Sequence, residues 1–345
     1  EHIAPHDSVE RLEAAGVAVI ASLGKFVGPG EIEAGGKTIR YRKAMIATGA
    51  SPMVPGIPGL RESEPLTSDT VWDLTKLPER LVVIGGGAIG CELGQAFSRL
   101  GSKVTLVEAA PRILSTLGKN VSELVMSRFE AEGMTVMPGT TVTGVEGSAT
   151  DGNLVVVVDH ETRIAADQVL VAVGRRPNTA NLNLNAVGVE LTERGHVKVD
   201  DRLETTNDHI YAGGDVIGKM PFTHTAGMHG GLVVSNALFG LRRKADHERI
   251  PYAIFCDPEV ASVGRIRPNG DEELTVSHFD YEHLDRQVTT GEPVGFVDLF
   301  TDNKGHLVGA TIVGDTAGET INEMTARILA GDKLRAIGQM VRPYP

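Results

Sequence analysis

The feature that most constrains this chain is a glycine-rich turn placed between an apolar strand and a helix. Leu81-Val82-Val83-Ile84 predicts a fully buried strand, and Ala88 to Leu100 predicts the helix that packs on it. Between them stands Gly85-Gly86-Gly87-Ala88-Ile89-Gly90, with the spacing G-x-G-x-x-G. The first glycine permits the tight turn, the second lets the backbone approach a pyrophosphate, and the third lets helix and strand pack closely. This order predicts a dinucleotide-binding βαβ unit.

An acidic residue follows at the spacing that such a unit requires. The next strand, Val104 to Val107, leads into Glu108, which lies 18 residues beyond Gly90 (108 − 90). The expected separation is roughly 20 residues. A carboxylate there accepts hydrogen bonds from ribose hydroxyls and repels a 2′-phosphate, and the nearest cation is Arg112. We therefore expect NAD rather than NADP, bound by Gly85, Gly87, Ala88, Ile89, Gly90 and Glu108.

Length and patterning place this unit in a larger α/β protein. A chain of 345 residues exceeds one ordinary domain. The apolar run Val169 to Val173 and the helical segment 119–132 continue the alternation of strands and helices, which predicts a parallel sheet covered by helices. From Ile250 onward, mixed strands precede helices at 316–330 and 332–341, which indicates a separate α+β domain.

Charge and cysteine usage argue against several classes of protein. The 33 basic and 45 acidic side chains give a net charge of −12, so the basic footprint of a nucleic-acid-binding protein is absent. No stretch approaches roughly 18 consecutive apolar residues, which argues against a membrane span. The two cysteines, Cys91 and Cys256, suggest neither a disulfide framework nor a metal-thiolate site. We expect a cytoplasmic protein that binds no metal as a resident cofactor.

Four further segments complete a recognisable order along the chain. They are Ala47-Thr48-Gly49-Ala50, Val173-Gly174-Arg175-Arg176-Pro177-Asn178, Ile210-Tyr211-Ala212-Gly213-Gly214-Asp215 and Asp257-Pro258-Glu259-Val260-Ala261-Ser262-Val263-Gly264. Together with the glycine loop, they make the chain resemble the class I flavoprotein disulfide reductases, the pyridine nucleotide-disulfide oxidoreductase family. Thr67-Ser68-Asp69-Thr70 makes it most similar to the members that resemble mercuric reductase and dihydrolipoamide dehydrogenase.

The resemblance implies two Rossmann-like nucleotide-binding domains and a C-terminal α+β interface domain that forms a homodimer. Residues 1–76 would be the first segment of an incomplete FAD-binding domain and 176–248 its returning segment. Residues 77–175 would be the NAD-binding domain and 249–345 the dimerisation domain. The family's first FAD loop and its Cys-x4-Cys disulfide precede the segment that Glu1 would match, so we expect an N-terminally truncated chain.

The resemblance also assigns cofactor-binding residues outside the glycine loop. Asp215 would hydrogen-bond the ribityl chain of FAD, and Thr48-Gly49 would lie along the same cofactor. Thr223 begins a helix whose N-terminus would face the flavin, where the helix dipole stabilises negative charge. Gly214 and Gly174 complete the set.

Two residues are catalytic candidates by resemblance. Glu92 matches the acid that contacts the nicotinamide amide in the family. Tyr344, in Arg342-Pro343-Tyr344-Pro345, aligns with a His-Pro pair whose histidine is an acid/base in the family. A tyrosine with an ordinary pKa of about 10 is a poor general base at neutral pH, so a hydrogen-bonding or metal-ligating role suits Tyr344 better.

The predicted function is that of an FAD- and NAD(P)H-dependent oxidoreductase, mercuric reductase-like, in which hydride passes from NADH to flavin and on to an acceptor. The acceptor would be a disulfide, another small molecule or a metal ion. Cys91 cannot replace the redox disulfide, because it lies on the NAD helix and its only companion is Cys256. Two alternatives stay open: a non-catalytic, NAD-binding and dimerising fragment, and a disulfide-free transhydrogenase.

Overall fold

The computed structural model describes residues 8–149, 152–159, 161–266, 273–291 and 293–344. Glu1, which bears on the expected truncation, and Pro345 lie outside these ranges. The chain forms two compact units: the first combines residues up to Ala50 with Pro177–Ala245, and the second combines Ser51–Arg176 with the residues from Asp246 onward. The division into an FAD-binding domain of two segments, an NAD-binding domain and a dimerisation domain, expected from the sequence, stays a prediction.

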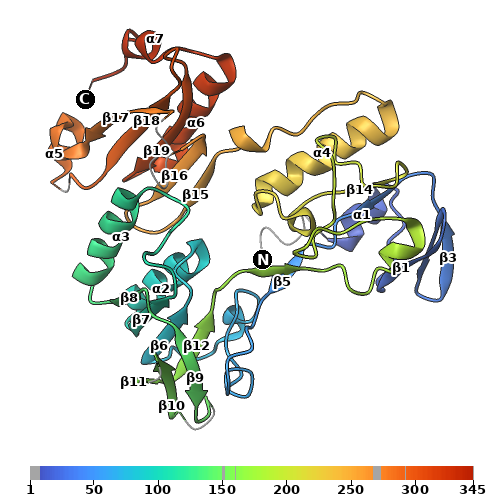
Figure 1. Cartoon of the computed structure of the whole chain (residues 1–345), viewed down its shortest axis with the longest axis horizontal. Helices are drawn as coiled ribbons and strands as arrows, with labels where there is room; N and C mark the ends of the chain where they lie inside the picture. Colours follow the sequence, from blue (N-terminus) through green and yellow to red (C-terminus); the bar gives the residue numbers. More distant parts are fainter. Residues whose placement is uncertain (1–7, 150–151, 160, 267–272, 292, 345) are drawn as a thin grey trace. The chain divides into compact units, whose positions relative to one another are not determined.

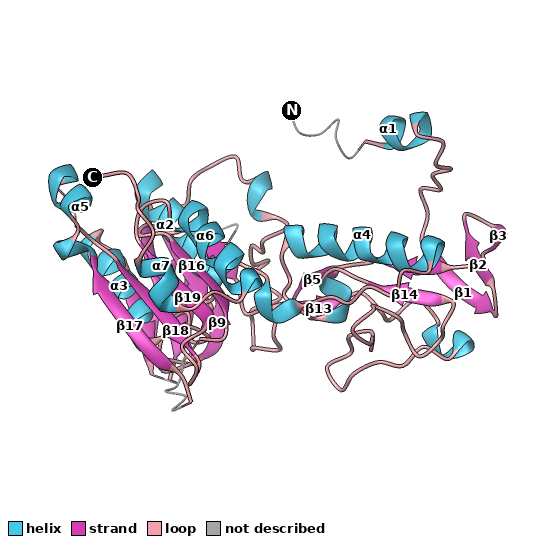
Figure 2. Cartoon of the chain, turned by 90° about the horizontal axis from the view of Figure 1, so that it is seen from above, coloured by secondary structure: helices cyan, strands magenta, loops and turns pink. Residues whose placement is uncertain are grey.

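The first unit is built around a short parallel pair of strands and one long helix. β4 (Ala44–Ile46) pairs in parallel with β14 (Ile210–Ala212), and α4 (Thr223–Phe239) lies beside β14 (Figures 1 and 2). Ile46, Ile210 and Val233 belong to their common apolar core. The other elements of this unit are α1 (Val9–Ala14), the antiparallel strands β1 (Gly24–Gly28), β2 (Glu31–Ala34) and β3 (Lys37–Arg40), and the 3-10 helices η3 (Leu184–Val187) and η4 (Asp215–Ile217).

The second unit contains the predicted parallel sheet, with strand order β12-β6-β7-β8. Its helices α2 and α3 pack on β6 and β7 and on β8, respectively (Figure 1). The sheet and the helices confirm the α/β prediction, because strands and helices alternate along this part of the chain. The bounds are β6 (Arg80–Ile84), α2 (Ala88–Leu100), β7 (Lys103–Glu108), α3 (Lys119–Ala131), β8 (Thr135–Pro138), β12 (Gln168–Val171) and the antiparallel β9 (Val142–Glu146), β10 (Leu154–Val158) and β11 (Thr162–Ala166).

The C-terminal part of the second unit is an antiparallel sheet of order β15-β16-β19-β18-β17, with α6 packed on β16 and β19. This confirms the α+β fold expected after Ile250. Helix 316–330 is found almost as predicted, whereas α7 is shorter than the predicted 332–341 and ends at Gly338, a residue that destabilises helices. The bounds are β15 (Tyr252–Ile254), β16 (Val260–Gly264), β17 (Thr275–Asp280), α5 (Asp285–Thr290), β18 (Phe296–Thr301), β19 (Leu307–Val313), α6 (Ala317–Ala330) and α7 (Leu334–Gly338).

Two short strands, β5 (Ala50–Pro52) and β13 (Arg175–Pro177), pair where the chain passes between the units. None of the helices in the described ranges is long and apolar enough to span a membrane.

The position of α2 on the parallel sheet depends on the third glycine of the loop. A Cβ added at Gly90 would lie 1.9 Å from the carbonyl oxygen of Gly85, far inside any real contact. At Gly87 an added Cβ would meet nothing within 4 Å, and the backbone has an ordinary φ of −78°. Close packing of helix and strand is therefore the role of Gly90, and Gly87 leaves open space.

These two glycines give a matched prediction about stability. Gly90→Ala should lower the free energy of unfolding by about 1–3 kcal/mol, because the helix must move away from the strand. Gly87→Ala should change it by at most about 0.5 kcal/mol, since the methyl group meets no neighbour. Urea unfolding followed by circular dichroism measures both. Equal losses of stability in the two variants would contradict this assignment.

Candidate functional site

The glycine loop leaves open space at Gly87, the residue that precedes the first turn of α2. Gly85 has φ +107°, and an added Cβ would lie 2.5 Å from the oxygen of Ala172, so only glycine fits the turn. Gly87 is the N-cap residue of α2 and provides no side-chain cap, so it leaves the first N–H groups without a cap from that position. An uncapped helix N-terminus beside open space is suited to bind a phosphate group.

Glu108 lies at the end of β7, next to this loop. Its Oε2 accepts a hydrogen bond from the N–H of Gly86 at 2.6 Å, and its Oε1 accepts one from the N–H of Ala110 at 2.6 Å. Two backbone donors therefore fix the carboxylate in place. A carboxylate offers about four lone-pair directions, so further acceptor capacity is left for ribose hydroxyls.

Glu92 extends the site along the same helix. Its Oε1 accepts a hydrogen bond of 2.8 Å from the backbone N–H of Phe255, in the turn between β15 and β16. Burial raises the pKa of Glu92, and the Phe255 N–H opposes that rise because it favours the carboxylate. The predicted nicotinamide acid is thus a partly buried carboxyl group held by the C-terminal part of the second unit.

The FAD-binding candidates lie in the first unit. The Thr48 hydroxyl donates to the oxygen of Asn178 at 2.8 Å, and the N–H of Asn178 donates to the oxygen of Gly49 at 3.0 Å. Gly214, at φ +75°, donates its N–H to His229 Nδ1 at 3.0 Å, and Asp215 begins η4 directly after it. Thr223 is the first residue of α4, whose N-cap Phe222 makes no side-chain cap.

The second unit holds the other two predicted site residues in different surroundings. Gly174 has φ +119°, and an added Cβ there would meet no atom within 4 Å. The Tyr344 hydroxyl donates to Asp285 Oδ2 at 2.8 Å, and this carboxylate raises the pKa of Tyr344. Tyr344 therefore has a hydrogen-bonding partner, and even less of it is in the basic phenolate form at neutral pH than of an ordinary tyrosine. It contacts α5, whereas Glu92 contacts Phe255.

Both cysteines are buried in the second unit. Burial raises the pKa of Cys256 to about 12 and raises that of Cys91 well above its ordinary value. A thiol with a raised pKa provides little thiolate at neutral pH and is a poor nucleophile. This agrees with a packing role for Cys91.

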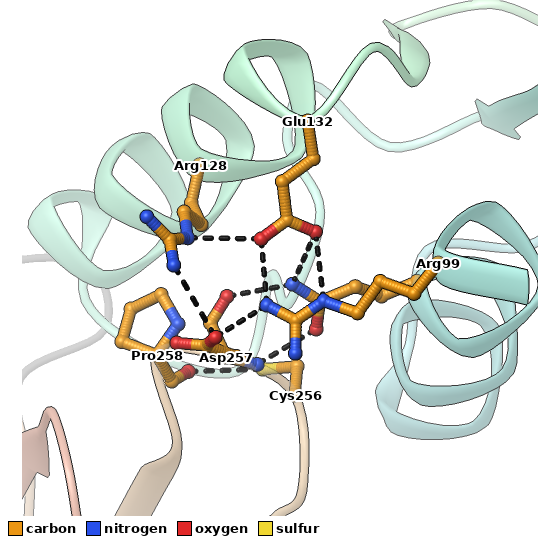
Figure 3. A network of polar contacts seen from close by, with 7 residues as sticks. Arg99, Arg128, Glu132, Cys256, Asp257 and Pro258 are labelled. Carbon is orange, nitrogen blue, oxygen red and sulfur yellow. Dashed lines mark hydrogen bonds and ion pairs between the residues drawn. The ribbon is translucent and has the colours of Figure 1, made fainter.

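A cluster of ion pairs joins α2 and α3 to the β15–β16 turn. Figure 3 shows Arg99 and Arg128 directed at the Asp257 carboxylate, with Glu132 between the two guanidinium groups. Glu132 Oε1 lies 2.6 Å from Arg99 and 2.9 Å from Arg128. The arginines lower the pKa of Glu132, chiefly through the Arg99 hydrogen bond, and lower that of Asp257 against the opposing effect of burial. The turn is therefore held by two helices of the nucleotide-binding segment.

Sequence reasoning missed this docking and the residues that make it, above all Gln95 and Asp257. The two side chains of α2 that bind the backbone of the turn, Glu92 and Gln95, are three residues apart and so share one helix face. That spacing was visible in the sequence. The partner segment was not, because Gln95 and Asp257 are 162 positions apart.

A group of polar side chains around His278, here called the histidine cluster, joins the start of α3 to the C-terminal sheet; its other members are Asn120, Asp280 and Asp298. His278 Nδ1 lies 2.5 Å from Asp298 Oδ1, and His278 Nε2 lies 2.9 Å from Asp280 Oδ1. Asn120 of α3 donates to Asp298 Oδ2 at 2.8 Å. Because both ring nitrogens face carboxylates, the imidazolium form fits best, and the pKa of His278 is raised, chiefly by the Asp298 hydrogen bond. A cavity of about 330 Å³ adjoins these residues.

Comparison with known proteins places the chain in one family. The family described as pyridine nucleotide-disulphide oxidoreductase matches residues 5–230, and its dimerisation domain matches residues 250–345. The chain belongs to this family. Proteins of the family bind FAD and NAD(P)H.

Individual relatives support the same assignment. The chain is 36% identical to a mercuric reductase of Bacillus cereus over 334 residues, which are 95% of this chain and 53% of the relative. It is 35% identical to a dihydrolipoyl dehydrogenase of Thermus scotoductus over 345 residues, covering 95% of this chain and 72% of that protein. The solved HOCl-induced flavoprotein disulfide reductase RclA of Escherichia coli matches with a TM-score of 0.84 and 28% identity, over 95% of this chain and 76% of that chain. The chain thus spans about half of the first of these relatives.

The histidine cluster makes stability depend on pH. The folded pKa of His278 is raised above its unfolded value of about 6.5, so the stability it contributes is full below that pH. It is lost as the pH rises through the folded pKa. In His278→Asn an amide can replace the Nδ1 donor but cannot carry the charge. Because the side chain is 42% exposed, the effect should be at most about 1 kcal/mol.

Thermal unfolding at several pH values measures this effect. The Tm of wild type should exceed that of His278→Asn by at most about 2 °C at pH 6, and the difference should vanish at high pH. A difference that is independent of pH would contradict a charged His278.

Proposed function

We propose that this chain provides the NAD(H)-binding and dimerisation parts of a flavin-dependent oxidoreductase, mercuric reductase-like, that uses FAD and passes hydride from NADH toward a disulfide, another small molecule or a metal ion. The observation that carries the proposal is the open N-terminus of α2 at Gly87, next to the fixed carboxylate of Glu108. Phosphate and ribose are the two parts of a dinucleotide that these groups can bind.

Different residues of the chain would bind different parts of the dinucleotide. The loop at Gly85 to Gly87 would receive the pyrophosphate, Glu108 would accept hydrogen bonds from the adenosine ribose, and Glu92 would hold the nicotinamide amide. Gly174 would let the backbone pass close to the nucleotide. Bound NADH and FAD would together supply a hydride donor and its acceptor.

The FAD-binding proposal rests on the first unit. An added Cβ at Gly49 would meet nothing within 4 Å, and one at Gly213 would lie 2.8 Å from Met45 and 2.9 Å from His229. Gly49 therefore leaves room for a ligand, whereas Gly213 lets β14 approach α4. Thr48, Gly49, Gly214, Asp215 and Thr223 are compatible with contacts to FAD. We also propose a homodimer, because residues 250–345 match the family's dimerisation domain.

A second candidate function is NAD binding and dimerisation without catalysis by this chain. It is favoured by the burial and the raised pKa values of Cys91 and Cys256, which leave neither as a ready thiolate. Adding FAD and an electron acceptor to the purified chain distinguishes the two. NADH oxidation above background supports catalysis, and binding without oxidation supports the second candidate.

Nucleotide titration tests the binding proposal and the cofactor preference together. Wild type should bind NADH more tightly than NADPH, because the Glu108 carboxylate repels a 2′-phosphate. Glu108→Ala should lose about 1.5–3 kcal/mol of NADH affinity, roughly 10- to 150-fold in Kd, and most of the preference. Fluorescence titration with NADH and NADPH measures both.

Gly87→Ala is a second test variant, because it should fold normally and its methyl group should fill the space that the pyrophosphate needs. It should bind NADH much more weakly than wild type. Unchanged NADH affinity in both variants would remove the glycine loop and Glu108 from the site.

A further inference from the structure

The β15–β16 turn presents backbone groups that α2 satisfies with side chains. The N–H of Phe255 donates to Glu92 Oε1 at 2.8 Å, and the N–H of Asp257 donates to Gln95 Oε1 at 2.7 Å. Gln95 Nε2 donates back to the oxygen of Asp257 at 2.7 Å and to Glu132 Oε2 at 3.1 Å. One face of α2 thus binds the main chain of the turn at two residues, Phe255 and Asp257.

Gln95 is the member of this contact that cannot easily be replaced. Gln95 is only 3% exposed, and its amide oxygen and amide nitrogen bind the N–H and the carbonyl oxygen of one residue of the turn, Asp257. An amide is the group that can both donate to a carbonyl and accept from an N–H in this arrangement. If it were removed, the N–H and the carbonyl of Asp257 would each lose a partner in a partly buried place, which is unfavourable.

The same contact determines where Glu92 finds its donor. Phe255 and Asp257 are two residues apart in one turn, and Glu92 and Gln95 are one helical turn apart, so fixing Asp257 on Gln95 also fixes the Phe255 N–H on Glu92. The ion pairs of Asp257 with Arg99 and Arg128 hold the side chain of the turn, whereas Gln95 holds its backbone. Only the backbone contact lies next to Glu92.

We propose that Gln95 is a positioning residue of the nucleotide site: it anchors the β15–β16 turn so that the Phe255 N–H orients the Glu92 carboxylate for the nicotinamide amide. This rests on the proposed function only for the role of Glu92. The anchoring itself concerns the protein without nucleotide. The C-terminal part of the second unit thereby contributes to nucleotide recognition through a residue of α2.

Carboxyl carbon NMR of the nucleotide-free chain tests the anchoring, with Glu92→Gln assigning the signal. In Gln95→Met, which has similar volume and no amide, Glu92 should titrate at higher pH than in wild type, because it loses the Phe255 donor. In Gln95→Asn the side chain is too short to reach the turn, so the titration of Glu92 should shift in the same direction. This variant replaces the Met variant if the latter does not fold. Val156→Ala, a buried residue of β10, is the control for lost stability and should leave the Glu92 titration unchanged.

NADH titration of the same variants tests the consequence. The Kd should rise about 10-fold in Gln95→Met and stay within 2-fold of wild type in Val156→Ala, on the scale of one hydrogen bond. An unshifted Glu92 titration in both Gln95 variants would overturn the anchoring. A shifted titration with unchanged Kd would overturn the positioning role. If wild type binds no NADH, the proposed function fails, and the titration still decides the anchoring.

Discussion

The approach of Gly90 to the carbonyl of Gly85 is the contact on which the rest of the second unit depends. It lets α2 lie directly on β6, so that the N-terminus of the helix emerges at Gly87 next to the end of β7. Glu108 then reaches the loop and is fixed by the Gly86 N–H. Another face of α2 then meets the β15–β16 turn. There Glu92 and Gln95 accept hydrogen bonds from backbone N–H groups, and Arg99 forms an ion pair with Asp257.

Local patterns were sufficient to predict the elements that carry the nucleotide site. The apolar run at β6, the glycine loop and the helix from Ala88 to Leu100 are consecutive in sequence, so periodicity and glycine spacing determine them. The family was also recognisable from ordered motifs. Contacts between distant segments could not be predicted in this way. The docking of Gln95 on Asp257 joins positions 162 apart, and the His278–Asp298 pair depends on the register of β17 with β18.

The site candidates fall into two sets that correspond to the two compact units. Those for NAD, from Gly85 to Glu108 and at Gly174, belong to the second unit, and those for FAD, such as Asp215, belong to the first. The second unit also contains the segment that matches the dimerisation domain. The NAD candidates therefore share a compact unit with that segment, and one of them, Glu92, contacts it directly at Phe255. This explains why α2 carries a buried polar side chain, Gln95, on the face that meets the β15–β16 turn.

A crystal structure of the chain with NADH would test the nucleotide site most directly. We predict electron density for the pyrophosphate at the N–H groups of Gly87 and Ala88, with the Gly86 N–H still bound to Glu108 and ribose hydroxyls within hydrogen-bond distance of that carboxylate. The nicotinamide end should lie at Glu92, with the Phe255 N–H still bound to that carboxylate. Density for NADH at another place, or a nucleotide whose ribose makes no contact with Glu108, would contradict this prediction.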